Sequence, residues 1–474
     1  MDREHLLLFP FMAQGHLIPF FNLAKLIEQR KRFAITIVNT PLNIAKLQSS
    51  LPPNSAIHLM ELPFSSSEHG LPPNSENTDS LPLHLFTTFF QATETLRPAF
   101  EHLVSNIIQQ QGHNRLCIVA DMFFGWTVES AKKLGVFHSV FVTSGAYASA
   151  IIFSLWLHTP LLAESYDEVP LIDFPEVKIH HSQLINAIVS SDGMDPTTVF
   201  LRQQISLSFQ SSELLLNTVE ELEREGLRLL RNISRLPVWS IGPIASTVPS
   251  SDHISDSWMK FLDSNPPASV LYVSFGSQNA IPASQMMELA LGLEAGGKPF
   301  IWVIRAPPRE IEDGEDDRIV WLPEGFEDRI TEKKQGFLVH GWAPQPEILS
   351  HPSTGAFLSH CGWNSVLESL SQGVPIIGWP LLGDQLFNSK MMEEEMGVCV
   401  EIARGRGADA LRNGWKWVKE AIELVMGGTE EGREMRRKAS KIREMMAGAL
   451  KGSSFKAMEN FLETAFSTTM NDLK

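Results

Sequence analysis

Short apolar runs alternate with longer segments of helical periodicity through most of the chain. Runs such as Leu6–Phe9 and Ala34–Asn39 are followed by stretches in which apolar residues recur every three or four positions. Repeated strand–helix–strand units of this kind build a mostly parallel sheet with helices on both faces. The pattern therefore predicts an α/β protein.

The alternation occurs in both halves of the chain. In the first half we predict strands at Leu6–Phe9, Ala34–Asn39, Ile57–Leu62, Leu116–Ala120 and Ser139–Thr143, and helices at Pro19–Arg30, Leu81–Gln110 and Gly125–Leu134. In the second half we predict strands at Ser269–Phe275, Phe300–Arg305, Phe337–His340, Thr354–Leu358, Pro375–Trp379 and Val398–Ile402. The 474 residues are enough for two or three domains.

A polar stretch rich in Ser, Pro and Asp, Ala245–Asp256, separates the two halves and is typical of an interdomain linker. We predict a first domain over residues 1–244, a linker over 245–257, a second domain over 258–452 and a terminal helix over 453–474 that packs back on the first domain. A second polar stretch, Arg309–Arg318, is predicted to be a loop. Ligands of open α/β folds bind at the carboxyl ends of the strands, so we expect the chemistry in a cleft between the two sheets.

The densest motif is a 44-residue stretch, Trp342–Gln385, in the second half. It resembles the donor-binding signature of plant family 1 UDP-dependent glycosyltransferases, which have the GT-B fold of two Rossmann-like domains facing across a cleft. The positions in register are Trp342, Ala343, Pro344, Gln345, His351, Pro352, Gly355, His360, Cys361, Gly362, Trp363, Asn364, Ser365, Glu368, Gly373, Val374, Pro375, Trp379, Pro380, Asp384 and Gln385.

The residues support this reading without the family name. The run His360–Ser365 follows a predicted strand and opens a helix, so that backbone N–H groups and small polar side chains gather at a helix N-terminus. Such a terminus favours a diphosphate, and it supplies partial positive charge in a chain of net charge −16.

The resemblance implies a role for each part of the motif. Trp342 would stack on uracil and the Ala343 backbone would bind the base, while Gln345 and Glu368 would hold the ribose hydroxyls. The phosphates would be contacted by His360, Asn364, Ser365 and by Ser277, which follows another predicted strand. Trp363, Asp384 and Gln385 would contact the sugar, and the glutamine at the last position favours UDP-glucose.

Three plainer readings apply in this region. Trp379 is interpreted as a core residue. His351, His360 and Cys361 lack a fourth metal ligand, so we expect no metal site. The Gly405–Ala410 segment matches a dinucleotide fingerprint, but it lacks the acidic residue that should follow and is interpreted as a coincidence.

The first half offers a catalytic pair. The segment Phe9–His16 resembles the family's N-terminal segment, in which the histidine deprotonates the acceptor hydroxyl. His16 follows the first strand, which places it at the carboxyl edge of the sheet, and an unshifted histidine titrates near pH 6.5, which suits a general base. Asp121 ends another apolar strand and is costly there unless it is paired. Pairing with His16 would fix the imidazole tautomer; the alternative is a helix N-cap.

The implied reaction is a direct displacement that inverts the anomeric carbon of UDP-glucose. Thr143, at the end of the next strand, is expected to contact the transferred sugar, as in similar enzymes. Aromatic residues near these segments are expected to form a pocket for a small lipophilic acceptor such as a flavonoid, phenylpropanoid or terpenoid, although each of them could instead be core: Phe11, Phe86, Phe90, Phe123, Phe124 and Tyr147.

The overall charge limits the partners. With 39 basic and 55 acidic residues and a pI near 5.4, the chain is unsuited to nucleic acid or to anionic membrane surfaces. Its three cysteines form no C-x-x-C pair, and no signal peptide or membrane span is predicted. We therefore expect a cytoplasmic, monomeric enzyme that needs no metal or cofactor besides UDP-glucose as donor substrate.

Alternative functions remain open from the sequence. They are transfer of another sugar, a non-catalytic nucleotide-sugar-binding module and a nicotinamide oxidoreductase, whose fingerprint glycines are missing after the first strand.

Overall fold

The computed structural model describes residues 3–159, 168–245, 256–277, 280–306, 321–405, 410–411 and 413–467. The chain divides into two compact units, one formed by Met1–Ser246 with Gly448–Lys474 and the other by Thr247–Ala447. Most of the predicted linker, the polar stretch Arg309–Arg318 and the centre of the Gly405–Ala410 segment lie outside the described residues.

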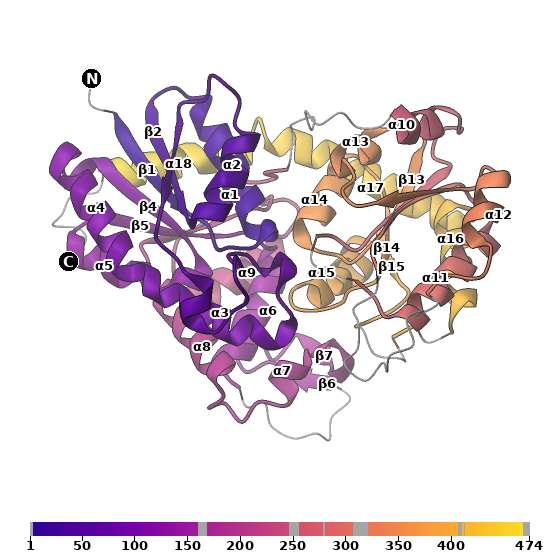
Figure 1. Ribbon diagram of the computed structural model, residues 1–474, viewed down its shortest axis with the longest axis horizontal. Helices are drawn as coiled ribbons and strands as arrows, with labels where there is room; N and C mark the ends of the chain where they lie inside the picture. The colour runs from indigo at the N-terminus through magenta and orange to yellow at the C-terminus, as the bar shows by residue number, and fades with distance from the viewer. Residues whose placement is uncertain are drawn as a thin grey trace. The chain divides into compact units, whose positions relative to one another are not determined.

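The first unit is built on a seven-stranded parallel sheet in the order β3-β2-β1-β4-β5-β8-β9 (Figure 1). The strands are β1 (Glu4–Phe9), β2 (Phe33–Asn39), β3 (Ile57–Glu61), β4 (Leu116–Asp121), β5 (Phe137–Val142), β8 (Glu213–Leu216) and β9 (Val238–Ser240). The five predicted strands are present. Strands β8 and β9 were not predicted, because at four and three residues they are too short to show a period.

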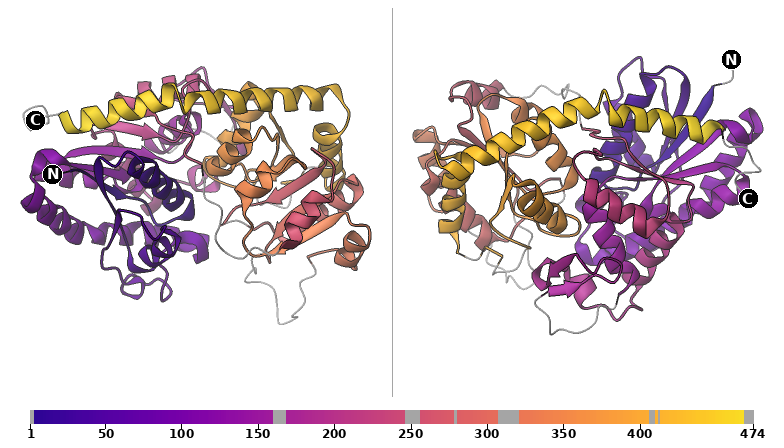
Figure 2. Two further views of the ribbon diagram at one scale, coloured as in Figure 1. Left: turned by 90° about the horizontal axis from the view of Figure 1, so that it is seen from above. Right: turned by 180° about the vertical axis from the view of Figure 1, so that it is seen from behind.

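Helices cover both faces of this sheet. On one face, α1 (Gln14–Glu28), α2 (Pro41–Ser50) and α18 (Ser453–Ser467) share an apolar core with alternate strand residues. On the other face, the ring of Phe9 in β1 stacks on Phe100 of α4 (Arg97–Gln111). The terminal helix α18 contacts β4, β5 and β9 (Figure 2), with Phe461 and Leu462 in the core.

Three predicted helices differ from those observed. Helix α1 begins at Gln14 instead of Pro19, so that His16 lies within its first turn. The helix tolerates Pro19 because the proline removes only one hydrogen bond, while the buried face of the helix, which carries Phe20, packs in the core. The predicted helix Leu81–Gln110 is divided into η3 (Leu83–Leu85), α3 (Phe86–Thr93), η4 (Glu94–Leu96) and α4, because Pro98 lacks the N–H that would continue the ladder. The third, Gly125–Leu134, is observed as α5 (Thr127–Leu134), which begins two residues later and is preceded by η6 (Met122–Phe124).

The remaining elements of the first unit follow β5. They are α6 (Ala146–Leu157), a two-stranded hairpin of β6 (Glu168–Pro170) and β7 (Lys178–His180), α7 (Asn186–Val189), α8 (Pro196–Ser208) and α9 (Arg224–Ser234). Helix α6 packs against α8 and α9.

The second unit contains a six-stranded parallel sheet in the order β12-β11-β10-β13-β14-β15. Its strands are β10 (Val270–Ser274), β11 (Phe300–Ile304), β12 (Gly336–His340), β13 (Thr354–Ser359), β14 (Ile376–Gly378) and β15 (Cys399–Glu401), all close to the predicted ranges. Its helices are α10 (Asp256–Asp263), α11 (Ala283–Gly296), α12 (Phe326–Glu332), α13 (Gln345–Ser350), α14 (Trp363–Ser371), α15 (Gln385–Met391), α16 (Trp415–Met426) and α17 (Glu430–Ala449).

Both sheets reverse their winding at one point. In the first unit β1 lies between β2 and β4, and in the second β10 lies between β11 and β13, so that helices depart to opposite faces on either side of these strands. Ligands of doubly wound sheets bind where the order reverses, at the carboxyl ends of the strands. No helix among the described residues combines the length and the apolar run needed to cross a bilayer.

Candidate active site

The first unit brings His16 and Asp121 together at its reversal point. Strands β1 and β4 are neighbours, with Phe9 opposite Ala120, so the residues that follow them meet at one edge of the sheet. The Nδ1 atom of His16 lies 2.7 Å from Oδ2 of Asp121. The carboxylate is fully buried, whereas the imidazole remains 23% exposed. A buried acceptor-only carboxylate places the histidine proton on Nδ1 and the lone pair on Nε2.

Asp121 also caps the turn that follows its strand. Its Oδ1 atom accepts a hydrogen bond of 3.1 Å from the backbone N–H of Phe123, at the start of η6. Both sequence readings of this residue are therefore present, one on each carboxylate oxygen. The cap holds the carboxylate in place, so the orientation of His16 is set by the backbone.

Thr143 follows β5 and joins the same group. Its Oγ1 atom lies 3.2 Å from Nδ1 of His16. Thr143, which we predicted to contact the sugar, therefore lies beside the His16–Asp121 pair, on the Asp121 side of the imidazole.

Aromatic rings surround the imidazole. The ring of His16 meets those of Phe11 and Phe123 edge-on at 5.6 and 5.4 Å, and these two rings stack on each other at 4.6 Å. Phe90 contacts both, and Phe86 contacts Phe90. Apolar walls of this kind exclude water from a base and suit a lipophilic ligand.

Two of the predicted aromatic residues are buried. Phe124 is fully buried and stacks on Phe9 at 4.2 Å, which makes it a core residue. Tyr147, in α6, is 4% exposed, and its backbone N–H donates to the buried carboxylate of Glu223.

In the second unit, two glycines enclose the ring of His360. A Cβ atom at Gly276, after β10, would come within 2.7 Å of this ring, and one at Gly362 within 2.5 Å. The two glycines thus allow the backbone turns after β10 and β13 to close over the imidazole. Burial lowers the pKa of His360 to about 4, opposed by a hydrogen bond with the Ser274 backbone, so the ring is neutral at physiological pH.

The turn after β13 ends at the N-terminus of α14. Cys361 has a left-handed backbone with φ of 63°, which turns the chain before Gly362 caps the helix. Trp363, Asn364 and Ser365 form its first turn, where the backbone N–H groups have no intrahelical acceptor. The geometry is that of an anion-binding terminus, next to the Gly276–Ser277 turn.

Asn388 is a functional residue that the sequence reasoning missed. It is fully buried, and its Nδ2 atom donates to the carbonyl of Cys361 at 3.0 Å and to Oδ2 of Asp384 at 3.1 Å. It therefore ties the turn before α14 to the residue predicted to contact the sugar. The spacing of four residues from Asp384, one helical turn, was the available signal.

Gln385 begins α15 and is also nearly buried. Its Oε1 atom accepts hydrogen bonds from the backbone N–H groups of Leu381 and Leu382, at 3.0 and 3.2 Å. The side-chain carbonyl thus holds the preceding loop, and only the amide NH₂ of Gln385 can donate to a ligand.

Gln345 and Glu368 lie together between α13 and α14. The Nε2 atom of Gln345 donates to Oε2 of Glu368 at 2.7 Å and to Oγ of Ser365 at 2.9 Å. Burial raises the pKa of Glu368 to about 7, although the bond from Gln345 partly offsets this. A carboxylate with a further oxygen available is suited to accept from vicinal hydroxyls.

The tryptophans of the motif divide by exposure. The indole of Trp342 is 67% exposed just after β12, which leaves an aromatic face for stacking, while the adjacent Ala343 is buried. Trp363 is 3% exposed at the first position of α14. Trp379 is fully buried in the core, as predicted, against the edge of Phe275.

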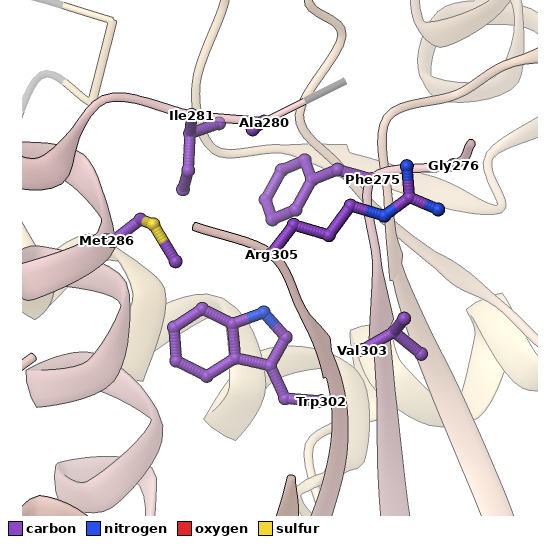
Figure 3. A pocket seen from close by; sticks show the side chains of 8 residues that line it. All are labelled: Phe275, Gly276, Ala280, Ile281, Met286, Trp302, Val303 and Arg305. Carbon is purple, nitrogen blue, oxygen red and sulfur yellow. The ribbon is translucent and has the colours of Figure 1, made fainter. Parts of the chain in front are cut away.

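A small hollow lies beside the Gly276–Ser277 turn (Figure 3). Its empty space, including the part open to solvent, is about 280 Å³. The apolar side chains of Ile281, Met286 and Trp302 face it, and the guanidinium of Arg305 donates to the backbone carbonyl of Ser277. Arg305, which the sequence reasoning did not single out, thus fixes the turn.

The residues considered as metal ligands do not form a metal-binding cluster among the residues that the structure describes. The ring of His351 bonds to Ser353 at 2.8 Å and to Asp263 at 3.2 Å. Across the part of the chain that the structure describes, no three His, Cys, Asp or Glu side chains are grouped as metal ligands would be.

Comparisons with known proteins show the family of the chain. The model of the family "UDP-glucoronosyl and UDP-glucosyl transferase" matches residues 236–418, and that of "Glycosyltransferase, N-terminal domain" matches residues 5–246. UDP-glycosyltransferase 92A1 of Arabidopsis thaliana is 42% identical over 97% of this chain and 96% of its own length. Crocetin glucosyltransferase 3 of Crocus sativus is 48% identical over 92% and 94%.

Solved structures are similar over almost the whole chain. The protein UGT73P12 of Glycyrrhiza uralensis, complexed with glycyrrhetinic acid 3-O-monoglucuronide, gives a TM-score of 0.83 at 29% identity and covers 98% of this chain and 96% of its own. UGT2 of Phytolacca americana, complexed with UDP-2fluoro-glucose and pterostilbene, gives 0.80 at 26% identity, with coverage of 97% and 99%.

The two doubly wound parallel sheets and the similarity to solved glycosyltransferase structures define a GT-B glycosyltransferase. The chain belongs to the family of plant UDP-dependent glycosyltransferases. It is therefore an enzyme that transfers a sugar from a UDP-sugar, which excludes the oxidoreductase and the non-catalytic binding module considered from the sequence.

Proposed function

We propose that this enzyme transfers glucose from UDP-glucose to a hydroxyl or carboxyl group of a small lipophilic metabolite, with inversion at the anomeric carbon. The observation that carries the proposal is the 2.7 Å contact between His16 and Asp121. It prepares an imidazole whose Nε2 can take a proton from an acceptor.

His16 acts as the general base. As the acceptor oxygen attacks the anomeric carbon, its proton passes to Nε2 of His16, and the bond from that carbon to the β-phosphate oxygen breaks. UDP leaves with the electron pair of that bond. The buried Asp121 carboxylate stabilises the imidazolium that forms, without taking the proton itself. No covalent sugar–enzyme intermediate is needed.

The second unit binds the donor. Trp342 stacks on uracil, the Ala343 backbone binds the base, and Gln345 and Glu368 bind the ribose. The diphosphate lies at the N-terminus of α14 with His360, Asn364, Ser365 and the Ser277 turn, where N–H dipoles stabilise the charge that develops on the leaving group. Support comes from the exposed indole and the helix start in the structure. We propose that no metal takes part.

Asp384, Gln385, Trp363 and Thr143 bind the glucose. The name of crocetin glucosyltransferase 3 and the bound UDP-2fluoro-glucose of the Phytolacca americana structure support glucose as the sugar. Gln385, at the last position of the motif, supports it as well.

The acceptor is a lipophilic compound such as a flavonoid, phenylpropanoid or terpenoid. The Phe11, Phe90 and Phe123 rings around His16 support this class. Scopoletin glucosyltransferase of Nicotiana tabacum, 33% identical over 98% of both chains, and UDP-glucose flavonoid 3-O-glucosyltransferase 7 of Fragaria ananassa, 34% identical over 96% and 94%, are named for compounds of this kind.

We further propose that the enzyme works as a monomer in the cytoplasm. The support is that Cys117, Cys361 and Cys399 are all buried free thiols, which a reducing compartment preserves.

The test is a panel of flavonoids, phenylpropanoids and terpenoids incubated with UDP-glucose, with and without EDTA. A product heavier by one hexose residue, with a β-linkage by NMR and formed equally in both samples, is expected. An α-linked product would contradict inversion, and loss of product with EDTA would contradict the metal-free proposal.

A further inference from the structure

We propose that Tyr272 is a positioning residue for the donor, which orients the amide of Gln345 and, through it, the carboxylate of Glu368. This inference rests on the proposed ribose contact of Glu368. Tyr272 lies on β10, shares a core with residues of α10 and α13, and is only 1% exposed.

Two hydrogen bonds connect this tyrosine to the carboxylate. The Tyr272 hydroxyl donates to Oε1 of Gln345 at 3.4 Å. The Nε2 atom of Gln345 then donates to Oε2 of Glu368 at 2.7 Å.

The direction of the first hydrogen bond is fixed by its acceptor. An amide oxygen can only accept, so the Tyr272 proton points at Oε1 of Gln345. This leaves both hydrogens of Nε2 for Glu368 and Ser365, which lie 2.7 and 2.9 Å away.

A flipped amide would be unfavourable in this place. It would set Oε1 against the Glu368 oxygen, and two facing acceptors in a buried site repel each other. It would also present an N–H group to the hydroxyl proton of Tyr272. Tyr272 and Glu368 thus select one orientation of the Gln345 amide. This orientation fixes the Glu368 carboxylate, which can then accept from two adjacent ribose hydroxyls.

The substitution Tyr272→Phe isolates the hydroxyl. The ring packs against Phe357 at 4.9 Å, and phenylalanine keeps that contact. Only the donor to Gln345 is lost, so the amide can rotate and Glu368 loses its fixed partner. The expected consequence is weaker ribose recognition with unchanged recognition of uracil.

The experiment measures the binding of UDP and of 2′,3′-dideoxy-UDP by calorimetry. We expect the wild-type enzyme to bind UDP about 100-fold tighter, because two hydrogen bonds to a charged group are lost with the hydroxyls. In Tyr272→Phe this ratio should fall roughly tenfold. At saturating UDP-glucose, the variant should keep its kcat while the KM for UDP-glucose rises.

Trp342→Ala is the matched control. It removes the proposed uracil stacking and should weaken both nucleotides equally, which leaves the ratio unchanged. Gln345→Met should lower the ratio, and adding Tyr272→Phe to it should have no further effect, because both changes break the same hydrogen bond.

The outcomes separate this inference from the proposed function. A wild-type enzyme that binds both nucleotides equally would refute the proposed ribose contact. A wild-type preference that Tyr272→Phe leaves intact would overturn the positioning role alone. Should Tyr272→Phe not fold, Gln345→Met removes the acceptor of the Tyr272 hydroxyl and must reduce the ratio; an unchanged ratio overturns the inference.

Discussion

Nδ1 of His16 lies 2.7 Å from Oδ2 of Asp121, although 105 residues separate them in the chain. Their contact follows from the parallel pairing of β1 with β4, which brings the ends of both strands to one edge. The second oxygen of Asp121 is held by the Phe123 backbone, so the pair is oriented before any acceptor binds.

Asp121→Asn should abolish most of the transfer. Asparagine keeps the cap to Phe123, but its NH₂ group favours the tautomer with the proton on Nε2 of His16, which is the wrong atom for a base. We expect kcat to fall by about 10³- to 10⁴-fold, with UDP affinity unchanged, by steady-state kinetics and calorimetry. A variant that retains a tenth of the wild-type kcat would show that the carboxylate does not set the tautomer.

Donor binding should depend on pH through Glu368. Its pKa in the empty site is about 7, so it is increasingly protonated below that pH. Ribose hydroxyls that donate to the ionised form lower this pKa, and binding then releases a proton. Affinity for UDP-glucose should therefore weaken as the pH falls below 7, by up to about tenfold per pH unit, and level off above 7.

The matched variant for this measurement is Glu368→Gln, which cannot ionise. It should bind UDP-glucose weakly and independently of pH from pH 5 to 8, because the diphosphate of UDP-glucose, unlike the terminal phosphate of UDP, does not titrate in this range. His360 adds no slope in this range, because its pKa is about 4. A wild-type affinity that is flat between pH 5.5 and 8 would contradict the assignment of the ionised carboxylate to the ribose.

Gln385 allows sugar recognition to be separated from loop structure. Gln385→His should lower the preference for UDP-glucose over UDP-galactose, but it also removes the carbonyl that holds Leu381 and Leu382. Gln385→Glu keeps an oxygen for the loop and replaces the NH₂ donor by a second, negatively charged acceptor. We expect its KM for UDP-glucose to rise about tenfold with an unchanged melting temperature. If neither variant alters the ratio of the two donors, other contacts select the sugar.

Asn388→Ala should reduce kcat/KM for UDP-glucose by about 10- to 100-fold, because a buried amide that makes two hydrogen bonds is lost. The KM for the acceptor should not change. Lys390→Ala, on the same helix, removes only an ion pair with Glu394 and serves as the control. Equal kinetics for the two variants would mean that the hydrogen bonds from Asn388 to Cys361 and Asp384 do not contribute to kcat/KM for UDP-glucose.

Much of the architecture could be predicted from the sequence, because buried parallel strands leave apolar runs and their order follows from short connections. Strands such as β1 and β13 are of this kind. The short β8 and β9 leave no such pattern. The start of α1 was missed because Pro19 was taken as the limit of the helix. Packing of the buried face of α1 outweighs the one hydrogen bond that the proline removes.

The site shows the same division. His16 and Asp121 could be paired from strand ends and the cost of burial, since both signals are local. Tyr272 could not be found, because it acts by a hydrogen bond to a residue whose position only the folded chain supplies. Asn388 left one signal, its spacing from Asp384, while its bond to the Cys361 carbonyl depends on the folded chain. Thr143 was predicted beside the sugar, and its contact with Nδ1 of His16 depends on the register of β4 with β5.

The most direct test of the catalytic role of the His16–Asp121 pair is single-turnover transfer by His16→Ala, with UDP binding measured on the same preparation. We predict that UDP affinity stays within about twofold of the wild type and that the rate of glucoside formation falls by at least about 10³-fold. Transfer at the wild-type rate with intact UDP binding would contradict the account.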